Sequence, residues 1–396
     1  MSNNNNNRNK SKLSEKFLDL VLKNDEKWCK TMGFFNPYLD PWQYHLRGSI
    51  PIYDLEAYGR YPKHNFVYDK LFIAKSQDIN CGTLENFPPV NNKYSFPIFI
   101  KPRWGHLSAA SKNCFKIKDE KALEKYKKYK HMMWSDFIDG REGMTDFLIL
   151  NGKIVDHITY IYSENQLETA DEWKYIAPSS QPPDEIVSWV NTYLGTGYTG
   201  VANIQYRKNT IIEVGLRLAR SGAYVIVAQN EGKLKNIYNV IDQNYFDYNV
   251  NTNFTPFYAF KCHINIPILY IWPQYIVDML VRPFTPINFY EYYFEPTGNN
   301  GTIWFQFMHN DFNLGMSLKK RLELLFTITQ FLVIILFVVC IVTAFSNNNY
   351  KYYIIISLIL LYLTRFLNPN GSSYNLFKVQ KQKLLGNGPN IGPNDI

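Results

Sequence analysis

One segment near the C-terminal end constrains the fold of this chain more than any other. Residues 324–345 (LLFTITQFLVIILFVVCIVTAF) contain no charged side chain. At a rise of about 1.5 Å per residue, a helix of this length crosses the roughly 30 Å hydrocarbon core of a lipid bilayer. The segment therefore predicts a transmembrane helix in preference to a buried core helix, and it makes a lipid bilayer an expected partner of the chain.

A second apolar run, residues 352–367, follows after the short polar loop 346–351. It is shorter, and Arg365 interrupts its end, from where a long side chain can reach the lipid headgroups. We predict that this run also crosses the membrane and forms a helical hairpin with the first span. The alternative is a segment that lies along the membrane interface.

The charges on either side of the two runs predict their orientation. Basic residues precede the first run at 319–321 and occur again in the polar tail 368–396, whereas the connecting loop holds only Lys351. Positive residues accumulate in the cytoplasmic loops of membrane proteins. We therefore expect a multi-pass protein with two spans, whose N-terminal domain and C-terminal tail both lie in the cytoplasm.

The amino-acid composition limits the functions that the rest of the chain can have. Hydrophobic residues make up 46% of the chain and charged residues 19%, so a sizeable core is available. The net charge of +8 is spread along the chain, and the basic stretch 119–130 also carries acids, as a solvated helix face does, so we expect no nucleic-acid binding. Five cysteines without a C-x-x-C pair indicate neither a disulfide framework nor a zinc site.

The abundance of Asn, Ile, Lys and Tyr is typical of AT-rich coding, as in some giant DNA viruses and amoebae. On that basis we expect the membrane to be a viral or a host-cell one. The same composition leaves open the possibility that the chain is a structural membrane protein of a virus particle.

Residues 66–222 alternate helix and strand patterns. A helix is predicted at 67–77, a buried strand at 95–102, a second strand at 113–117 and a charged helix near 119–131. Further strands (MMWSDFI, TDFLILNG, KIVDHITYIYS), a helix (DEIVSWVNTYLG) and a strand pair (VANIQYR, NTIIEVGLR) follow. This alternation predicts an α+β or α/β domain of the nucleotide-binding type.

A G-x-G-x-x-G sequence at Gly195, Gly197 and Gly200 does not indicate a dinucleotide site. Such a fingerprint requires the order strand, glycines, helix, whereas here a helix precedes the glycines and a strand follows them. We expect these glycines to end the helix and to turn the chain into the strand.

Two features of this block suit a bound nucleotide. The strand FPIFIKP ends on Lys101, which can direct an ammonium group towards a phosphate, and the loop 103–111 with Gly105 and Ser108 can close over phosphates with its backbone N–H groups. In the last strand pair, Asn203 and Gln205 share one face.

Glu213 and Gly215 lie on the facing strand of that pair. If the two strands form a hairpin, Gln205 and Glu213 can reach one Mg²⁺ ion, a hard cation that takes oxygen ligands.

Taken in order, these residues resemble the ATP-grasp superfamily, and within it the carbamoyl-phosphate synthetase and biotin carboxylase branch. The resemblance covers roughly residues 66–225. It rests on the following motifs: Asp69–Lys70 at a helix start, Lys101–Pro102 at a strand end, the Gly/Ser loop 103–111, a hinge strand from Ser135 to Glu142, Asn203-Ile-Gln205, and the strand that reads Glu213-Val-Gly215-Leu-Arg217-Leu-Ala-Arg220-Ser221.

The resemblance implies a role for each position. Phosphate contacts are implied for Lys70, Lys101, Gly105 and Ser108, an adenine contact for the hinge backbone at Phe137 and Ile138, and a ribose contact for Glu142. Gln205, Glu213 and Asn203 are implied ligands of Mg²⁺, and Arg217 is implied as the catalytic residue that stabilises charge on the transferred phosphoryl group.

The implied activity is that of an ATP-dependent ligase tethered to a membrane. A carboxylate would be activated as an acyl phosphate and captured by an amine or another nucleophile, so the substrates would be small molecules, with ATP and Mg²⁺ as cofactors. One position departs from the family pattern, since Gly215 stands where the family has a metal-binding Asn. The alternative is therefore a catalytically inactive membrane protein of ATP-grasp fold that binds a nucleotide or a partner.

The expected fold class is α+β, an ATP-grasp domain of two α+β lobes followed by a transmembrane helical hairpin. The expected divisions are a disordered Asn-rich tail at 1–12, an N-terminal lobe at 13–95, the ATP-grasp domain at 96–262, an apolar juxtamembrane segment at 263–320, the two spans at 324–345 and 352–367, and the polar tail at 368–396. For residues 263–317 two alternatives stay open, a part of a domain core or an element resting on the bilayer.

Overall fold

The computed structural model describes residues 49–51, 54–88, 94–107, 114–163, 174–179, 181–219, 230–253, 257–264, 279–284, 287–296, 302–346 and 352–356. The chain forms two compact units, one built mainly on Tyr44–Ala259 and the other mainly on Phe260–Lys381. Several expectations fall outside the described residues: the Asn-rich tail, Ser108, the end of the second apolar run and the polar tail.

The first unit contains a small antiparallel sheet. Its strand order is β1-β4-β2-β3, with bounds Cys81–Thr83 for β1, Met132–Asp136 for β4, Ile98–Pro102 for β2 and Phe115–Ile117 for β3. The short helix α4 (Glu120–Glu124) follows β3. Apolar side chains of this sheet and α4, among them Ile98, Ile100, Leu123 and Trp134, form one core cluster.

A larger antiparallel sheet in the same unit has the order β7-β6-β5-β8-β9. The bounds are Tyr175–Ser179 for β7, Lys153–Tyr162 for β6, Glu142–Leu150 for β5, Gly200–Arg207 for β8 and Thr210–Gly215 for β9. Strand β5 lies between β6 and β8 and is buried on both faces except at its last residue, although it carries Glu142, Thr145 and Asp146. The predicted α+β class is confirmed, and so are the predicted strands of this block.

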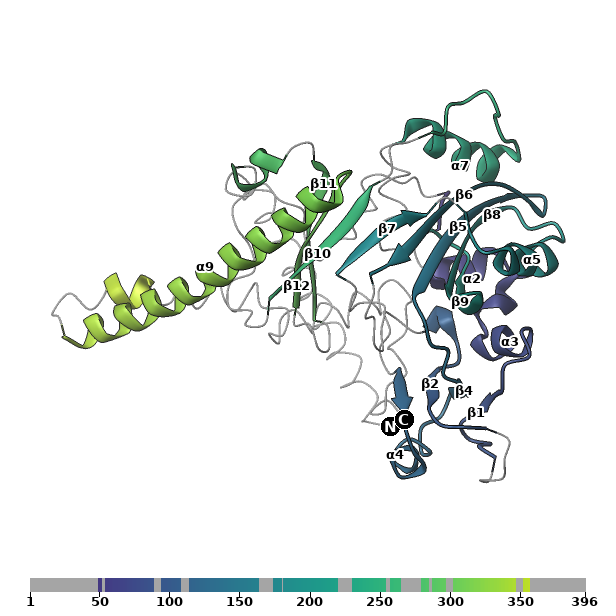
Figure 1. Ribbon diagram of the computed structural model, residues 1–396, viewed down its shortest axis with the longest axis horizontal. Helices are drawn as coiled ribbons and strands as arrows, with labels where there is room; N and C mark the ends of the chain where they lie inside the picture. Colours follow the sequence, from purple (N-terminus) through teal and green to yellow (C-terminus); the bar gives the residue numbers. More distant parts are fainter. Residues whose placement is uncertain are drawn as a thin grey trace, which may run out of the picture. The chain divides into compact units, whose positions relative to one another are not determined.

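Helices cover one face of the larger sheet. They are α2 (Asp54–Arg60), the 3₁₀ turn η2 (Asn65–Tyr68), α3 (Lys70–Lys75) and α5 (Asp184–Tyr193), as Figure 1 shows. The core beneath them includes Phe147, Ala202, Ile204, Ile211 and Val214.

Because side chains alternate along a strand, the other face of this sheet carries Glu142, Met144 and Asp146 of β5. In register with them on β8 are Arg207, Gln205 and Asn203. Beyond β8, Glu213 and Gly215 of β9 pair with Gln205 and Asn203. Helix α7 (Glu231–Gln243) borders the sheet beside β5 and β8.

The predicted helix over 67–77 is wrong in its continuity. The chain forms the turn η2 and then α3, with Asp69 between them in an extended conformation. The Asp69 carboxylate accepts a hydrogen bond from the backbone N–H of Leu71 at 3.0 Å, so Asp69 caps a new helix instead of continuing an old one. The charged helix predicted near 119–131 is also shorter, since α4 ends at Glu124.

The second unit contains β10 (Tyr258–Ile264), the 3₁₀ turn η5 (Arg282–Phe284), β11 (Ile287–Pro296), β12 (Thr302–His309) and the long helix α9 (Phe312–Ser346). Strands β11 and β12 pair as an antiparallel hairpin. Part of the segment expected to lie beside the membrane therefore forms β-structure.

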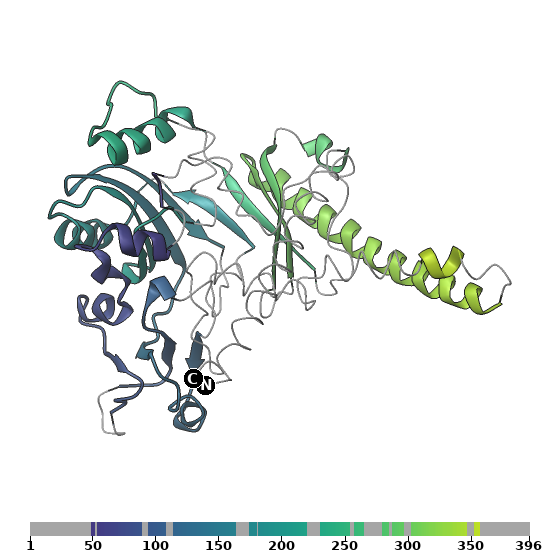
Figure 2. The ribbon, with the colours of Figure 1, turned by 180° about the vertical axis from the view of Figure 1, so that it is seen from behind.

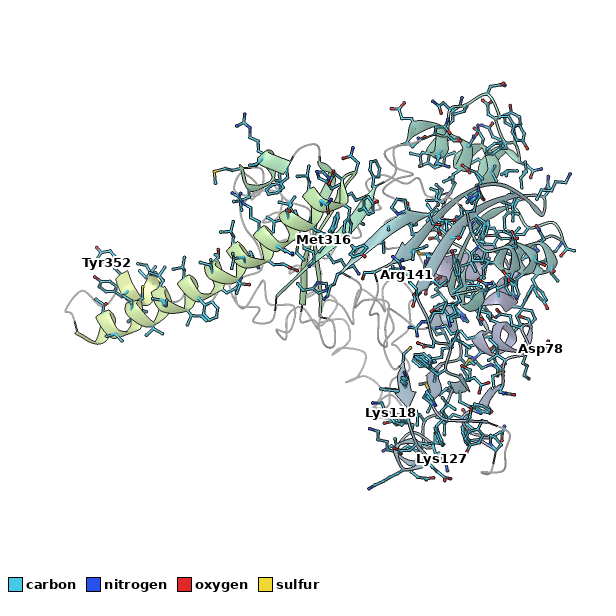
Figure 3. All side chains as sticks on the ribbon, in the orientation of Figure 1. Asp78, Lys118, Lys127, Arg141, Met316 and Tyr352 are labelled. Carbon is cyan, nitrogen blue, oxygen red and sulfur yellow. The ribbon has the colours of Figure 1, made fainter. Side chains whose placement is uncertain are left out.

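Helix α9 begins twelve residues before the apolar run predicted as the first span. Asp311 caps its start, with Oδ1 accepting a hydrogen bond from the N–H of Leu314 at 2.9 Å. Leu318, Leu322 and Phe326 are fully buried, whereas apolar side chains further along, such as Leu332, are about half exposed. Figures 2 and 3 show α9 from opposite sides, and Figure 3 labels Met316 near its start.

Within the described residues, one helix, Phe312–Cys340, is long and apolar enough to cross a membrane. Of the second predicted span only residues 352–356 are described, and they are helical. The two-span hairpin therefore stays a prediction.

Candidate functional site

Two lysines from different elements contact neighbouring residues of β9, Ile212 and Glu213. Lys70 is the first residue of α3 and is 4% exposed; its Nζ lies 3.2 Å from Oε1 of Glu213. Lys101, near the end of β2, donates from Nζ to the backbone oxygen of Ile212 at 2.8 Å. The small sheet, α3 and the larger sheet thus meet at β9.

The charges of these groups are strongly coupled. Burial, reinforced by the neighbouring Lys70 ammonium, lowers the pKa of Lys101 to about 8. Burial by itself would raise the pKa of Glu213, but Lys70, Lys101 and Arg217 outweigh it and leave that pKa below its usual value. Glu213 is therefore ionised at neutral pH. Its side chain is 38% exposed, so a ligand can reach it.

An ion pair fixes the position of Lys70. The Arg103 guanidinium donates to both carboxylate oxygens of Asp69, at 2.8 and 2.5 Å, and the N–H of Lys70 donates to the backbone oxygen of Arg103 at 2.9 Å. These bonds tie the start of α3 to the segment that follows β2. Gly105 lies in that segment, where an added Cβ would come within 3.7 Å of Oε1 of Glu213.

The side chain of Arg207 lies at the hinge between β4 and β5, and the family motifs assign this residue no role. The guanidinium of Arg207 lies 3.5 Å from Oε2 of Glu142, donates to the backbone oxygen of Ile138 at 3.2 Å, and stands 5.6 Å from the ring centre of Phe137. Arg207 and Glu142 are both buried. The three residues implied in adenine and ribose contacts are thus close together, and Arg207 holds them.

The hairpin of β8 and β9 has the predicted register, with Gln205 opposite Glu213 and Asn203 opposite Gly215. Asn203 is 2% exposed and its amide nitrogen donates to Oδ1 of Asp146 at 2.8 Å. Among the described residues, no group of three or more His, Cys, Asp or Glu side chains is placed to hold a metal ion. A magnesium site here would depend on Glu213, the amide oxygens and water, a ligand set that Mg²⁺ accepts.

The structure gives a physical reason for Gly215. A Cβ added at this position would come within 2.9 Å of Oδ1 of Asp54. Oδ2 of the same carboxylate accepts a hydrogen bond from Arg217 at 2.7 Å. A carboxylate from α2 therefore fills the space of the missing side chain and holds the arginine implied as catalytic.

Asp54, Arg207 and Asp146 were missed because they lie outside the family motifs or in unremarkable positions within strands. The available signal was period 2: Arg207 shares a strand face with Gln205, and Asp146 shares one with Glu142. Asp54 has no such signal, since its approach to Gly215 depends on packing across the domain.

No protein-family model matches the chain, and no curated protein matches its sequence. Among solved structures it is similar to an L-amino acid ligase from Bacillus licheniformis, with 17% identity and a TM-score of 0.47 over 64% of this chain and 69% of that chain.

It is also similar to a carboxyaminoimidazole ribonucleotide synthase from Aspergillus clavatus complexed with ATP (12%, TM-score 0.45, 68% and 79%). A phosphoribosylamine–glycine ligase from Thermotoga maritima is a third (13%, TM-score 0.45, 65% and 76%).

Proposed function

We propose that the unit built on Tyr44–Ala259 is an ATP-grasp domain that binds MgATP and acts as an ATP-dependent ligase. The observation that carries this proposal is the position of two lysines beside Glu213: Lys70 pairs with its carboxylate, and Lys101 donates to the backbone of the preceding residue, Ile212, and lowers the pKa of Glu213 through its charge. Two cations beside one exposed carboxylate suit a metal-bound polyphosphate, because the lysines can neutralise phosphate oxygens while the carboxylate binds the cation.

Magnesium fits the donors present. Glu213 supplies an exposed carboxylate, and Gln205 stands opposite it in the hairpin. Asp54 places a second carboxylate at the position where the family Asn would begin. Mg²⁺ is usually held by one or two carboxylates together with water and substrate phosphates, so this set is sufficient. The ion would offset the negative charge of the phosphates.

In the proposed reaction ATP phosphorylates a carboxylate, and an amine or another nucleophile displaces the phosphate from the acyl phosphate. The residues of this chain bind and orient the reactants. Lys70 and Lys101 hold phosphate oxygens, the hinge at Phe137 and Ile138 receives the base, and Arg217 stabilises charge on the transferred group. For that last role, Arg217 has to exchange its bond to Asp54 for a phosphate oxygen.

The Asp54–Arg217 pair also favours a second candidate, a nucleotide-binding protein without turnover. In the described arrangement the guanidinium of Arg217 donates to the carboxylate of Asp54 and not to a phosphoryl group. A nucleotide could still bind through Lys70, Lys101 and Glu213 in this arrangement. Phosphoryl transfer could not proceed, because Arg217 would not reach the transferred group.

The exposed apolar surface of α9 supports attachment to a bilayer. We propose that α9 crosses the membrane, that 352–367 crosses it in return, and that the ligase domain lies on the cytoplasmic side, where ATP is found.

The test is ATP binding and ADP release by the full chain in detergent, with a panel of carboxylates and amines. Wild type is expected to bind MgATP, and Glu213→Ala is expected to lose at least tenfold in affinity because the carboxylate facing the metal is gone. Glu120→Ala, which removes an exposed carboxylate of α4, is the matched control and should bind as wild type does. Equal binding by wild type and Glu213→Ala would refute the site, and binding without ADP release would favour the second candidate.

A further inference from the structure

Asp146, near the middle of β5, contacts two segments of the proposed ATP site. It is 3% exposed, and its Oδ1 accepts hydrogen bonds from the side-chain amide of Asn203 at 2.8 Å and from the backbone N–H of Ala219 at 3.0 Å. Asn203 lies opposite Asp146 on β8, and Ala219 follows Arg217 by two residues. Because both donors meet the same oxygen, the carboxylate cannot turn without losing both bonds, and its orientation is therefore fixed.

The contact with Asp146 decides how the amide of Asn203 is oriented. Oδ1 of Asp146 is the acceptor in both of its bonds, so it selects the donor end of the amide, which is the nitrogen. An amide is planar and carries its oxygen on the side opposite to its nitrogen. The oxygen of Asn203 is therefore directed away from β5, on the side of β9. It accepts no hydrogen bond from the residues that the structure describes.

On that side Asn203 pairs with Gly215, which has no side chain of its own. A carboxylate oxygen lies there instead, since Oδ1 of Asp54 is 2.9 Å from a Cβ added to Gly215. This oxygen is buried and has no hydrogen-bond partner among the described residues. Glu213, two residues before Gly215, adds a carboxylate that a ligand can reach. Buried acceptors without donors are costly, and a hard cation satisfies several of them at once.

We propose that Asp146 is a positioning residue of the magnesium site, which turns the amide oxygen of Asn203 towards the metal ion. The proposal rests on the proposed binding of MgATP and assigns a role to a residue that carries none in the family motifs. Asp146 acts through Asn203, as carboxylates that orient the ligands of a metal ion do. Without the acceptor at Asp146, the amide of Asn203 can rotate and present its NH₂ group, which a cation does not bind.

Two variants of Asp146 separate this role from an effect of its charge. Asp146→Asn removes the charge but keeps an oxygen that can accept both hydrogen bonds. Its amide nitrogen replaces Oδ2, which has no hydrogen-bond partner among the described residues, so no bond is broken. Asp146→Leu removes both the charge and the acceptor. Asp242→Leu, which removes an exposed acid of α7, is the control.

The test uses the full chain in detergent, with Mn²⁺ and a non-hydrolysable ATP analogue, because Mn²⁺ binds the same oxygen ligands as Mg²⁺ and is paramagnetic. Titration followed by EPR measures the Mn²⁺ affinity. Asp146→Leu should lose about tenfold or more, as the loss of an outer-shell partner does, whereas Asp146→Asn and Asp242→Leu should stay within about threefold of wild type. In an Asn203→Leu background, Asp146→Leu should cause no further loss, because the residue through which it acts is gone.

A spectroscopic measurement on wild type needs no variant. With asparagine labelled with carbon-13 in the chain, electron–nuclear double resonance should detect an asparagine carbonyl carbon coupled to the bound Mn²⁺. The coupling should persist in Asp146→Asn and disappear in Asp146→Leu. A loss of stability alone would not remove the coupling from chains that still bind the ion.

Three results overturn the proposal: bound Mn²⁺ without this coupling in wild type, equal Mn²⁺ affinity of folded Asp146→Asn and Asp146→Leu, or an undiminished loss by Asp146→Leu in the Asn203→Leu background. The wild-type coupling decides the question even if Asp146→Leu does not fold. A wild type that binds the ATP analogue with Mn²⁺ but shows no coupling refutes this inference alone. A wild type that binds no analogue refutes the proposed ATP site, and this inference with it.

Discussion

Lys101 changes its charge close to neutral pH. Its pKa of about 8 means that the ammonium is lost as the pH rises through 8, whereas an ordinary lysine keeps its charge to about 10.5. If Lys101 binds a phosphate, we expect ATP affinity to fall between pH 7 and pH 9. Titration calorimetry over this range measures the affinity. The control is Lys101→Met, which should bind ATP weakly at every pH and show no such pH dependence. A wild-type affinity that is flat across the range would exclude Lys101 from the phosphate site.

The lowered pKa of Lys101 also affects the stability of the folded chain. Between pH 8 and about 10.5 the unfolded chain binds more protons at this side chain than the folded chain does, so the free energy of unfolding should rise with pH in that window. Lys101→Met should remove this contribution, as denaturant unfolding at pH 8 and pH 10 would show.

At Gly215 the packing predicts the cost of restoring a side chain. Gly215→Asn brings a Cβ within 2.9 Å of Oδ1 of Asp54, and such overpacking costs about 1–3 kcal/mol. We expect the cost to be smaller in an Asp54→Ala background, because the clashing carboxylate is gone. A double-mutant cycle by denaturant unfolding measures this coupling. Equal costs in both backgrounds would mean that Asp54 does not fill the space at Gly215.

At the scale of elements, the hinge between β4 and β5 is held by the buried pair of Arg207 and Glu142. Removing one partner of such a pair leaves an uncompensated charge and costs about 3–5 kcal/mol. Arg207→Met should therefore destabilise the domain by that amount, and adding Glu142→Gln should recover part of it.

Arg141→Met is the matched control for that experiment, since Arg141 is exposed beside the same hinge (Figure 3) and donates only to the backbone oxygen of Tyr162 among its described bonds. We expect it to cost about 1 kcal/mol or less. A loss at Arg207 no larger than the loss at Arg141 would show that the buried pair does not hold the hinge.

Local sequence patterns predict some elements of the fold correctly and others wrongly. On β9 the strict period of 2 fails, because a β-bulge places Ile211 in the core with Val214 and not on the face of Glu213. The pairing of Gln205 with Glu213 is nevertheless correctly predicted, because a short turn fixes the register of two adjacent strands. The segment before α3 is not, because its apolar spacing is helical while Asp69 prefers to cap the next helix and to pair with Arg103. A long-range ion pair therefore overrides a local periodicity.

At the scale of the whole molecule, the expected topology has both termini in the cytoplasm. Reporter tags at each end and protease protection of the full chain in membranes test it. We expect cleavage of both tags from the cytoplasmic side, because basic residues flank both runs and the loop 346–351 holds one lysine. A protected C-terminal tag with an accessible N-terminal one would show that 352–367 does not return across the bilayer.

Local sequence patterns account for the features that depend on near neighbours along the chain. They predict the α+β class, the strands β5, β6, β8 and β9, the placement of Gln205 opposite Glu213, and a long apolar helix that the structure places within α9, but they do not predict β7. These features follow from the alternation of side chains on a strand and from an unbroken apolar run, both of which are local.

Packing in three dimensions alone brings the distant groups together. Asp54 reaches Gly215 and Arg217, more than 150 residues further along the chain, and Asp146 accepts a hydrogen bond from Asn203, 57 residues further along. Such encounters depend on how helices and sheets pack around a common core, and packing is a property of all the contacting surfaces together, so no local pattern encodes it.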